Sequence, residues 1–353
     1  MGHHVLPDSM PAAVYRGPGR IEVEDVPVPA PGSGQVLVEV DHCGVCGSDL
    51  HLLVEGWGKP GTIAGHELTG MVRATGAGVD RWRDGDRVVL GPMPRCGNCR
   101  RCRQGKPSQC ERRDHAVDEH LGGGFSRYFV TDARSLLPLP EGLAPRAAAL
   151  AEPLAVALHA ITRAGLEPGD DVMIFGAGPI GALAAATLVA RGGHRVTMVE
   201  PSPVRQDLAR HLGVDAVLGP EEVTQFPMWE PERLAEQAVD VVLECSGNKA
   251  AMEAGLHQLR RGGRLVIVGP GMAQPSFDPN RLLLNELQIL GSFVYDEDGF
   301  DVALELLASG ALPLDVLVEP EDVTLDRLGG VLAELARGTI AGKVLVVPRR
   351  AGQ

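Results

Sequence analysis

The sequence lacks the features that would place the protein in a membrane or outside the cell. It contains no run of 18 apolar residues, so we expect no membrane-spanning helix and no membrane partner. Its start, MGHHVLPDSM, does not contain the apolar core of a signal peptide, and we expect residues 1–9 to form a loose extension. Internal repeats and low-complexity tracts are also missing from the sequence.

Positive charge is scarce relative to negative charge. The 353 residues include 33 Lys and Arg against 46 Asp and Glu, a formal net charge of -13. Nonspecific binding to nucleic acid depends on neutralising phosphates, so we expect no nucleic-acid partner. Hydrophobic residues make up 44% of the chain, which is enough to bury the cores of two domains.

Cysteine is present but clustered. Four of the seven cysteines fall within residues 96–110. In a chain that shows no secretion signal, such clustering indicates metal binding in a reducing compartment rather than disulfides. We therefore expect a cytoplasmic protein.

Two sequence patterns divide the chain. Residues 10–155 are rich in turns and contain short Val-rich runs such as QVLVEV, which predicts a β-rich domain. Residues 156–292 alternate apolar runs such as DVMIFG and VDVVLE with segments of helical length. That alternation predicts a doubly wound parallel sheet and hence the α/β class. Residues 293–353 end in GKVLVVP, a predicted strand that we expect to return to the first domain.

A glycine-rich turn follows the first apolar run of the second region. In FGAGPIG the glycines are Gly176, Gly178 and Gly181, with Pro179 and Ile180 before the last. Between a strand and a helix, this pattern allows a tight turn, close approach of a pyrophosphate to the helix N-terminus and close packing of helix on strand. It predicts a dinucleotide site; the alternative is a tight turn that binds no ligand.

The choice between NAD and NADP depends on the end of the next strand. Glu200 lies 19 residues after Gly181, where a carboxylate accepts hydrogen bonds from the adenosine ribose and would repel a 2′-phosphate. We therefore predict NAD. Arg205 is either a further contact to this ribose or a solvated helix residue.

The four clustered cysteines predict a structural zinc site. Cys96, Cys99, Cys102 and Cys110 have the spacing C-x2-C-x2-C-x7-C, and four thiolates close a tetrahedron with no open position. The spacing does not fit a ferredoxin-like cluster. A disulfide framework conflicts with the expected compartment.

A second cluster predicts a catalytic zinc. Cys46 and His66 supply one thiolate and one imidazole, and the third ligand is a carboxylate, either Glu67 or Glu152. Three protein ligands leave a position open for water or substrate. We expect Asp49 to orient His66. The alternative is a redox pair formed by Cys46 and Cys43.

In these motifs the sequence resembles the zinc-dependent medium-chain dehydrogenases, the group that includes alcohol, sorbitol and threonine dehydrogenases. The segments GVCGSDLH, GHE, EPLAVALHA and GAGPIG and the four-cysteine loop follow in the order of that family, from Met10 to about Pro348. The resemblance implies a GroES-like catalytic domain, a Rossmann cofactor domain and a homodimer or homotetramer joined through the cofactor domains. It is closest to the polyol branch, because Glu152 stands where the alcohol branch has a cysteine.

The resemblance also implies residue roles. Cys46, His66 and Glu67 match catalytic zinc ligands, and Glu152 matches the position that binds the zinc or its water. Ser48 and His51 match a proton relay that runs through the cofactor ribose.

The predicted function is NAD- and zinc-dependent interconversion of a secondary alcohol or polyol and its ketone, with two zinc ions per chain. Three alternatives are a noncatalytic relative that binds NAD and zinc, a zinc-binding regulatory module and a zinc-free quinone reductase. The sequence does not identify the alcohol. Trp57 and Tyr295 are candidate walls of the substrate pocket, or simply surface and core residues.

Overall fold

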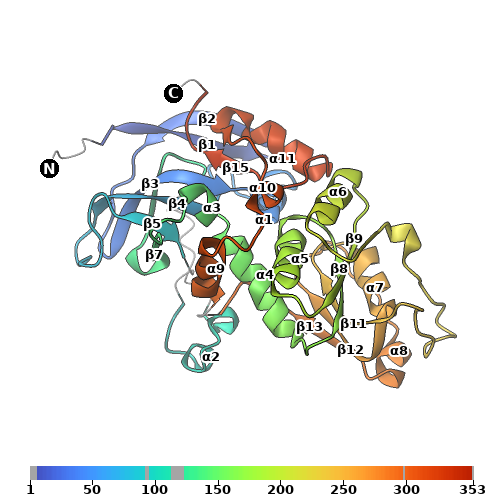
Figure 1. Cartoon of the computed structure of the whole chain (residues 1–353). Helices are drawn as coiled ribbons and strands as arrows, with labels where there is room; N and C mark the ends of the chain where they lie inside the picture. The colour runs from blue at the N-terminus through green and yellow to red at the C-terminus, as the bar shows by residue number, and fades with distance from the viewer. Residues whose placement is uncertain (1–5, 92–94, 113–122, 297–298, 352–353) are drawn as a thin grey trace.

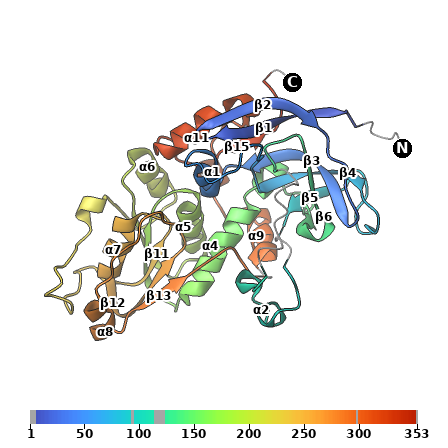
Figure 2. The ribbon, with the colours of Figure 1, turned by 180° about the vertical axis from the view of Figure 1, so that it is seen from behind.

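The structure is a computed structural model that describes residues 6–91, 95–112, 123–296 and 299–351. Two lobes lie side by side, with helices α4 and α9 packed together between them (Figures 1 and 2). The first lobe contains β1–β7 and the end of the chain, and we call it the catalytic lobe. The second contains β8–β13, and we call it the cofactor lobe.

The catalytic lobe is built on a seven-stranded sheet with the order β14-β15-β3-β4-β5-β7, in which β6 also pairs with β3. A separate hairpin is formed by β1 and β2. The strands before the cofactor lobe are β1 (Ser9–Gly17), β2 (Arg20–Pro27), β3 (Gln35–Gly44), β4 (Glu67–Thr75), β5 (Arg87–Leu90), β6 (Tyr128–Asp132) and β7 (Leu136–Pro138). The helices are α1 (Gly47–Leu53), α2 (Arg100–Arg103) and α3 (Pro145–Ala148).

Residues 8 and 9 are more ordered than the expected loose extension. Strand β1 already begins at Ser9, which pairs with Pro27, and the carbonyl of Asp8 accepts a hydrogen bond from the N–H of Val28. Residues 1–5 lie outside the described residues. The prediction of a loose segment is therefore wrong for Asp8 and Ser9, because main-chain pairing with β2 holds them.

The cofactor lobe contains the predicted parallel sheet. Six strands follow the order β10-β9-β8-β11-β12-β13, and every pair is parallel. The strands are β8 (Asp171–Phe175), β9 (Arg195–Val199), β10 (Ala216–Leu218), β11 (Val239–Glu244), β12 (Leu259–Ile267) and β13 (Gln288–Gly291). The helices are α4 (Ala151–Ala164), α5 (Pro179–Arg191), α6 (Pro203–His211), α7 (Lys249–His257) and α8 (Pro279–Leu284). The strand order reverses between β8 and β11, which is where doubly wound sheets bind nucleotides.

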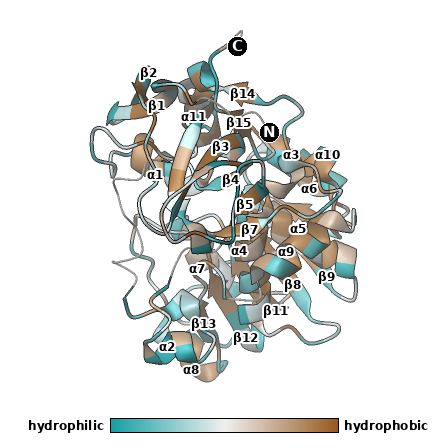
Figure 3. Cartoon of the chain, turned by 90° about the vertical axis from the view of Figure 1, so that its left-hand side faces the viewer, coloured by the Kyte–Doolittle hydropathy of each residue, from teal (hydrophilic) through white to brown (hydrophobic). Residues whose placement is uncertain are grey.

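Apolar packing explains why α4 and α5 lie against this sheet. In α5 the eight residues Gly181–Leu188 are all buried, and in α4 the buried set includes Leu154, Leu158 and Ile161. Figure 3 shows both helices and the nearby strands as largely apolar. The expected domain boundary at residues 155 and 156 lies inside α4.

The last part of the chain contributes to the sheet of the catalytic lobe. Its elements are α9 (Gly299–Ala308), α10 (Leu314–Leu317), β14 (Val323–Thr324), α11 (Leu328–Ala336) and β15 (Leu345–Val347). Strand β15 pairs antiparallel with the end of β3, where Leu345 faces Gly44. Within the described ranges, no helix has the length and apolar character needed to cross a bilayer.

Candidate functional site

Adjacent strands bring the predicted zinc ligands together. Cys46 follows β3, Glu67 begins β4, and Gly44 lies opposite Glu67 in the antiparallel pair. Ligand atoms of Cys46, His66 and Glu67 all lie within 4.8 Å of one another. A Cβ on Gly44 would lie 2.1 Å from a Glu67 carboxylate oxygen, so a side chain at that position would displace the Glu67 carboxylate.

Acidic groups surround His66. Burial opposes protonation, but Cys46, Asp49 and Glu152 outweigh it, and the pKa of His66 lies well above its ordinary value. Asp49 is fully buried, and its Oδ2 accepts a hydrogen bond from the N–H of Cys46 at 2.9 Å. Its Oδ1 is buried without a hydrogen-bond partner in the described structure. A metal cation between these groups would replace the proton that this environment favours on His66.

Lys343 reaches the same cluster from the other end of the chain. Its Nζ lies 2.6 and 2.8 Å from the two carboxylate oxygens of Glu67 and 2.9 Å from the carbonyl of Val45. Both side chains are buried, with 2% of Lys343 and none of Glu67 exposed. The role of Lys343 is not predicted by the sequence, because GKVLVVP indicates only a strand. Its lysine reaches this site because β15 pairs with β3.

Glu152 lies in the first turn of α4 and belongs to the same electrostatic environment. Burial raises the pKa of Glu152 to about 7, His66 opposes the rise, and Glu67 adds to it. Its oxygens lie outside the group of atoms formed by Cys46, His66 and Glu67. Glu152 is therefore a nearby carboxylate that interacts electrostatically with His66, while Glu67 lies in the group of atoms within 4.8 Å of one another.

The two predicted relay residues lie on helix α1. Ser48 and His51 are three residues apart and therefore share one face of the helix. The buried Asp49 accepts a hydrogen bond from the helix N-cap residue, Cys46, which fixes the start of α1 beside the cluster. The His51 ring contacts two residues beyond the helix, Glu55 and Trp57.

The four cysteines of the loop converge as predicted. Their sulfur atoms lie within 4.8 Å of one another, with Cys96 3.9 Å from Cys102 and 3.5 Å from Cys110. Tetrahedral zinc with Zn–S bonds of ~2.3 Å separates its sulfurs by ~3.8 Å. Backbone N–H donors lower the pKa of Cys99 to about 6, which favours the thiolate. Burial raises the pKa of Cys102 to about 12, so it is the spacing of the four sulfur atoms that fits a closed zinc site.

The glycine-rich turn has the geometry that its three glycines require. Gly176 has φ +93, and a Cβ on Gly181 would lie 1.9 Å from the carbonyl oxygen of Gly176. Gly178 is the N-cap of α5, and a Cβ there would meet nothing within 4 Å. Pro179 and Ile180 form the first turn of the helix. The carboxyl end of β8 and the N-terminus of α5 meet at this turn, the arrangement in which nucleotide-binding sheets hold a pyrophosphate.

Glu200 lies beside this turn. One of its carboxylate oxygens accepts a hydrogen bond from the N–H of Ala177 at 2.7 Å, and the other from Ser202 at 2.8 Å. Each oxygen has a second lone pair for a ribose hydroxyl. Arg205 is not merely solvated, since its Nε donates a hydrogen bond to the carbonyl of Ile340 at 3.0 Å.

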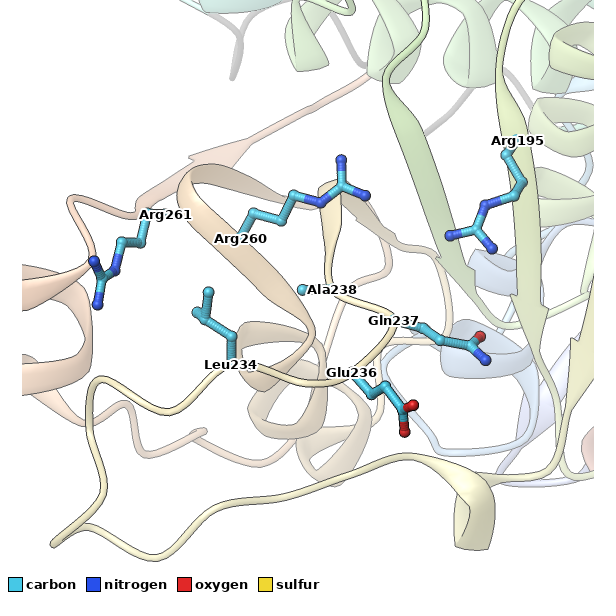
Figure 4. Close-up of a pocket in the computed structure, with 7 residues that line it drawn as sticks. All are labelled: Arg195, Leu234, Glu236, Gln237, Ala238, Arg260 and Arg261. Carbon is cyan, nitrogen blue, oxygen red and sulfur yellow. The ribbon is translucent and has the colours of Figure 1, made fainter.

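A surface pocket of about 820 Å³ lies elsewhere on the cofactor lobe (Figure 4). Its residues Arg195, Ala238 and Arg260 lie at the amino ends of β9, β11 and β12, opposite the nucleotide end of the sheet. Arg195 and Arg260 are paired with Asp171 and Asp240. The third arginine of the lining, Arg261, is largely exposed and lies 3.9 Å from Glu232.

The other residues named from the sequence, Cys43, Tyr295 and Trp57, lie outside the two groups of metal-binding side chains. Cys43 is buried in the core of the catalytic lobe, and burial raises its pKa well above the ordinary value, as expected of a packing residue. Cys43 and Cys46 are both free thiols. Tyr295 is 5% exposed and contacts Phe300 edge-on. Trp57 is 54% exposed.

Comparisons with known proteins agree with this geometry. Residues 32–141 match the family described as alcohol dehydrogenase GroES-like domain. Residues 179–309 match the zinc-binding dehydrogenase family.

Similar proteins differ in their named substrates and cofactors. Sorbitol dehydrogenase of Bacillus subtilis (strain 168) is 33% identical over 355 residues, covering 98% of this chain and 99% of that protein. Acetophenone reductase from Geotrichum candidum NBRC 4597, solved with NAD, is 28% identical with a TM-score of 0.84, covering 98% of each chain. A protein from Sinorhizobium meliloti 1021, solved with NADP, is 30% identical with a TM-score of 0.82, covering 97% of this chain and 100% of its own. The chain belongs to the zinc-dependent medium-chain dehydrogenases, in the polyol dehydrogenase-like branch, and is an oxidoreductase acting on CH–OH groups.

Proposed function

We propose that the protein interconverts a secondary alcohol or polyol and its ketone, using NAD and a zinc ion held by Cys46, His66 and Glu67. The observation that carries this proposal is the convergence of a cysteine sulfur, an imidazole nitrogen and a carboxylate oxygen within 4.8 Å. Three such donors suit a catalytic zinc with an open position. When bound, the zinc supplies Lewis acidity that polarises the substrate oxygen and lowers the pKa of an alcohol.

We assign Glu152 to the open side of this site. Its pKa of about 7 and its place next to, but outside, the three ligands suit a carboxylate that contacts the substrate or the water at the open position. Lys343 neutralises part of the acidic charge by pairing with Glu67. Without that ammonium, the buried carboxylates would repel one another.

Ser48 and His51 move the substrate proton in this proposal. Ser48 takes the hydroxyl proton, and His51 delivers it to solvent. Their position on one face of α1, immediately after Cys46, supports these roles. The nicotinamide accepts the hydride, and the lobes hold the reacting carbon against it.

We infer that NAD is the preferred cofactor. Glu200 lies at the carboxyl end of β9 and next to the glycine turn, where its carboxylate would repel the 2′-phosphate of NADP. Arg205 extends from α6 towards the backbone of Ile340. Its remaining guanidinium nitrogens supply donors near the ribose end of the cofactor site.

We further propose a structural role for the second zinc site, formed by Cys96, Cys99, Cys102 and Cys110. Four thiolates leave no position for substrate. The loop is anchored to the centre of the molecule, because the N–H of Ser108 donates a hydrogen bond to Asp296 at 3.0 Å. The bound metal would therefore brace a segment that lies beside α4 and α9.

We propose a cytoplasmic homodimer or homotetramer joined through the cofactor lobes. In the described part of the chain, β13 is an edge strand that pairs only with β12. Two apolar residues near this edge, Leu283 and Phe293, are 73% and 53% exposed. An unpaired edge with apolar neighbours is a ready site for association. We retain residues 10–155, 156–292 and 293–353 as the proposed division of the chain.

The direct test combines zinc analysis with NADH formation on a panel of secondary alcohols and polyols. We expect two zinc ions per chain and turnover of at least one substrate class, with kcat/KM for NAD more than tenfold above that for NADP. Two zinc ions and NAD binding without turnover would indicate a noncatalytic relative. One zinc and no NAD binding would indicate a regulatory module, and turnover without zinc would indicate a quinone reductase.

A further inference from the structure

Two side chains beyond the end of α1 hold the His51 ring. The Nδ1 atom of His51 lies 2.8 Å from the Oε2 atom of Glu55. The Trp57 ring stacks on the His51 ring, with 5.0 Å between centroids and 19° between planes. One contact lies on the edge of the imidazole and the other on its face, so together they define both its position and its rotation.

The backbone explains how both residues reach the ring. Glu55 is four residues after His51, just past the C-cap of α1, and its carboxylate reaches back to the ring. Gly56 has φ +87, which turns the chain back at the end of the helix. The N–H of Trp57 then donates a hydrogen bond to the carbonyl of His51 at 3.2 Å. A side chain at residue 56 would be strained by this φ, and its Cβ would lie 2.8 Å from Pro18.

The contact with Glu55 determines which imidazole nitrogen carries the proton. An ionised carboxylate only accepts hydrogen bonds, so Nδ1 must be the donor. Neutral His51 then has its proton on Nδ1 and its free lone pair on Nε2. A histidine that accepts a proton needs this arrangement, and a carboxylate on the opposite nitrogen stabilises the imidazolium that forms.

We propose that Glu55 is a positioning residue of the proton relay, holding His51 in the tautomer whose Nε2 accepts the substrate-derived proton. The inference rests on the relay role proposed above for His51. Each oxidation sends one hydride to NAD and one proton to the relay. His51 takes that proton on Nε2 and then releases one proton to solvent water, while its Nδ1 stays hydrogen-bonded to Glu55.

The test uses the zinc-loaded full-length protein and the alcohol of the panel that it oxidises fastest. Glu55→Ala should lower kcat by about tenfold or more, the scale seen when the partner of a functional histidine is removed, with the KM for NAD within about twofold. In a His51→Gln background, Glu55→Ala should change kcat by less than about twofold, because the two residues act as one unit.

A second readout separates positioning from general structural damage. In protein labelled with ¹⁵N-histidine, the His51 signal, assigned by its loss in His51→Gln, should report a proton on Nδ1. Glu55→Ala should abolish that preference without changing the melting temperature, since 42% of the Glu55 side chain is exposed. Trp57→Phe, which keeps an aromatic ring on the imidazole, serves as the matched control and should retain the Nδ1 proton.

The outcomes separate this inference from the function on which it rests. Full activity of His51→Gln would remove His51 from the relay and overturn both. Impaired His51→Gln with normal Glu55→Ala would overturn the role of Glu55 alone. An equal loss from Glu55→Ala with and without His51 would also overturn it, because Glu55 would then act elsewhere.

Discussion

At the scale of single residues, the site is a compact group of acidic side chains balanced by few cations. Glu67, Glu152 and Asp49 all influence the charge on His66 or Lys343. Burial alone would lower the pKa of Lys343, but Glu67 and Cys46 outweigh it, and the pKa lies above its ordinary value. Lys343 is therefore charged, and a bound zinc would be the second cation of the cluster.

The position of Glu152 leads to a prediction about turnover. Glu152→Ala should lower kcat by roughly 10- to 100-fold, the scale for residues that support a metal site. Cofactor binding should be unchanged, because the charged groups that act on Glu152 are those of the cluster around His66 and Glu67. Steady-state kinetics and NADH titration measure the two effects, with the exposed Glu141→Ala as control. Parent-like kcat in Glu152→Ala would show that Glu67 completes the site alone.

The buried pair of Lys343 and Glu67 leads to a prediction about stability. Lys343→Met should destabilise the zinc-free protein by about 3–5 kcal/mol, because it leaves a buried carboxylate without a partner. Zinc should restore part of the loss, since the metal supplies positive charge to Glu67. Urea unfolding with and without zinc measures this difference. The double variant Lys343→Met with Glu67→Gln should be more stable than Lys343→Met alone; if it is less stable, the account of this pair is wrong.

At the scale of secondary-structure elements, most features that depend on residues close together in the chain could be predicted from the sequence. The glycine turn and its flanking strand and helix were predicted from FGAGPIG and its context, because the glycine positions require that geometry. Strand β10 was missed, because its three residues are too short to produce a clear pattern. Cys46, His66 and Glu67 were predicted to lie together because GVCGSDLH and GHE are family motifs. Lys343 was missed because β15 meets β3 nearly 300 residues away in the chain.

A contact between His42 of β3 and Asp322, which precedes β14, is predicted to stabilise the fold in a way that depends on pH. His42 lies 3.0 Å from Asp322, and Asp41 is adjacent. Burial alone would lower the pKa of His42, but the two carboxylates raise it above the ordinary value. The native state therefore binds the proton more tightly than the unfolded chain. The contact stabilises the fold fully when the pH is below ~6.5, the pKa of His42 in the unfolded chain. This stabilisation is lost as the pH rises through the pKa of His42 in the folded protein, which is higher.

Thermal melting at several pH values tests the His42 contact. His42→Asn should lower the melting temperature at mildly acidic pH and have little effect at alkaline pH. His211→Asn is the control, since the ring of His211 meets a backbone carbonyl rather than a carboxylate. A loss that stays constant across this range would mean that His42 contributes packing and not charge.

The four-cysteine loop is predicted to depend on its metal for structure. Cys99→Ser should leave one zinc per chain and lower the melting temperature, because binding energy at a structural zinc is folding energy. Turnover should persist in the molecules that remain folded. Zinc analysis, melting and kinetics are compared with Cys245→Ser, which lies outside both clusters. Unchanged stability and zinc content with complete loss of turnover would instead identify this loop as the chemical site.

At the scale of the whole molecule, residues 338–343 form a short segment that contacts both lobes. Ser202 and Arg205 of the cofactor lobe bond to the carbonyls of Gly338 and Ile340. The chain then reaches Lys343, which contacts Glu67 in the catalytic lobe. A few residues of the chain thus connect α6 of the cofactor lobe to the Lys343–Glu67 pair. Neither connection could be predicted from local patterns, because each joins residues more than 130 positions apart.

The central claim is that the protein carries out its chemistry at an open zinc site that includes Cys46. The most direct measurement is NADH formation by Cys46→Ser, with zinc content and NAD binding determined on the same sample. An open catalytic zinc contributes chemistry more than scaffold. We predict a folded protein that binds NAD, retains one zinc per chain in the four-cysteine loop and has no measurable turnover. Parent-like turnover in Cys46→Ser would contradict the account.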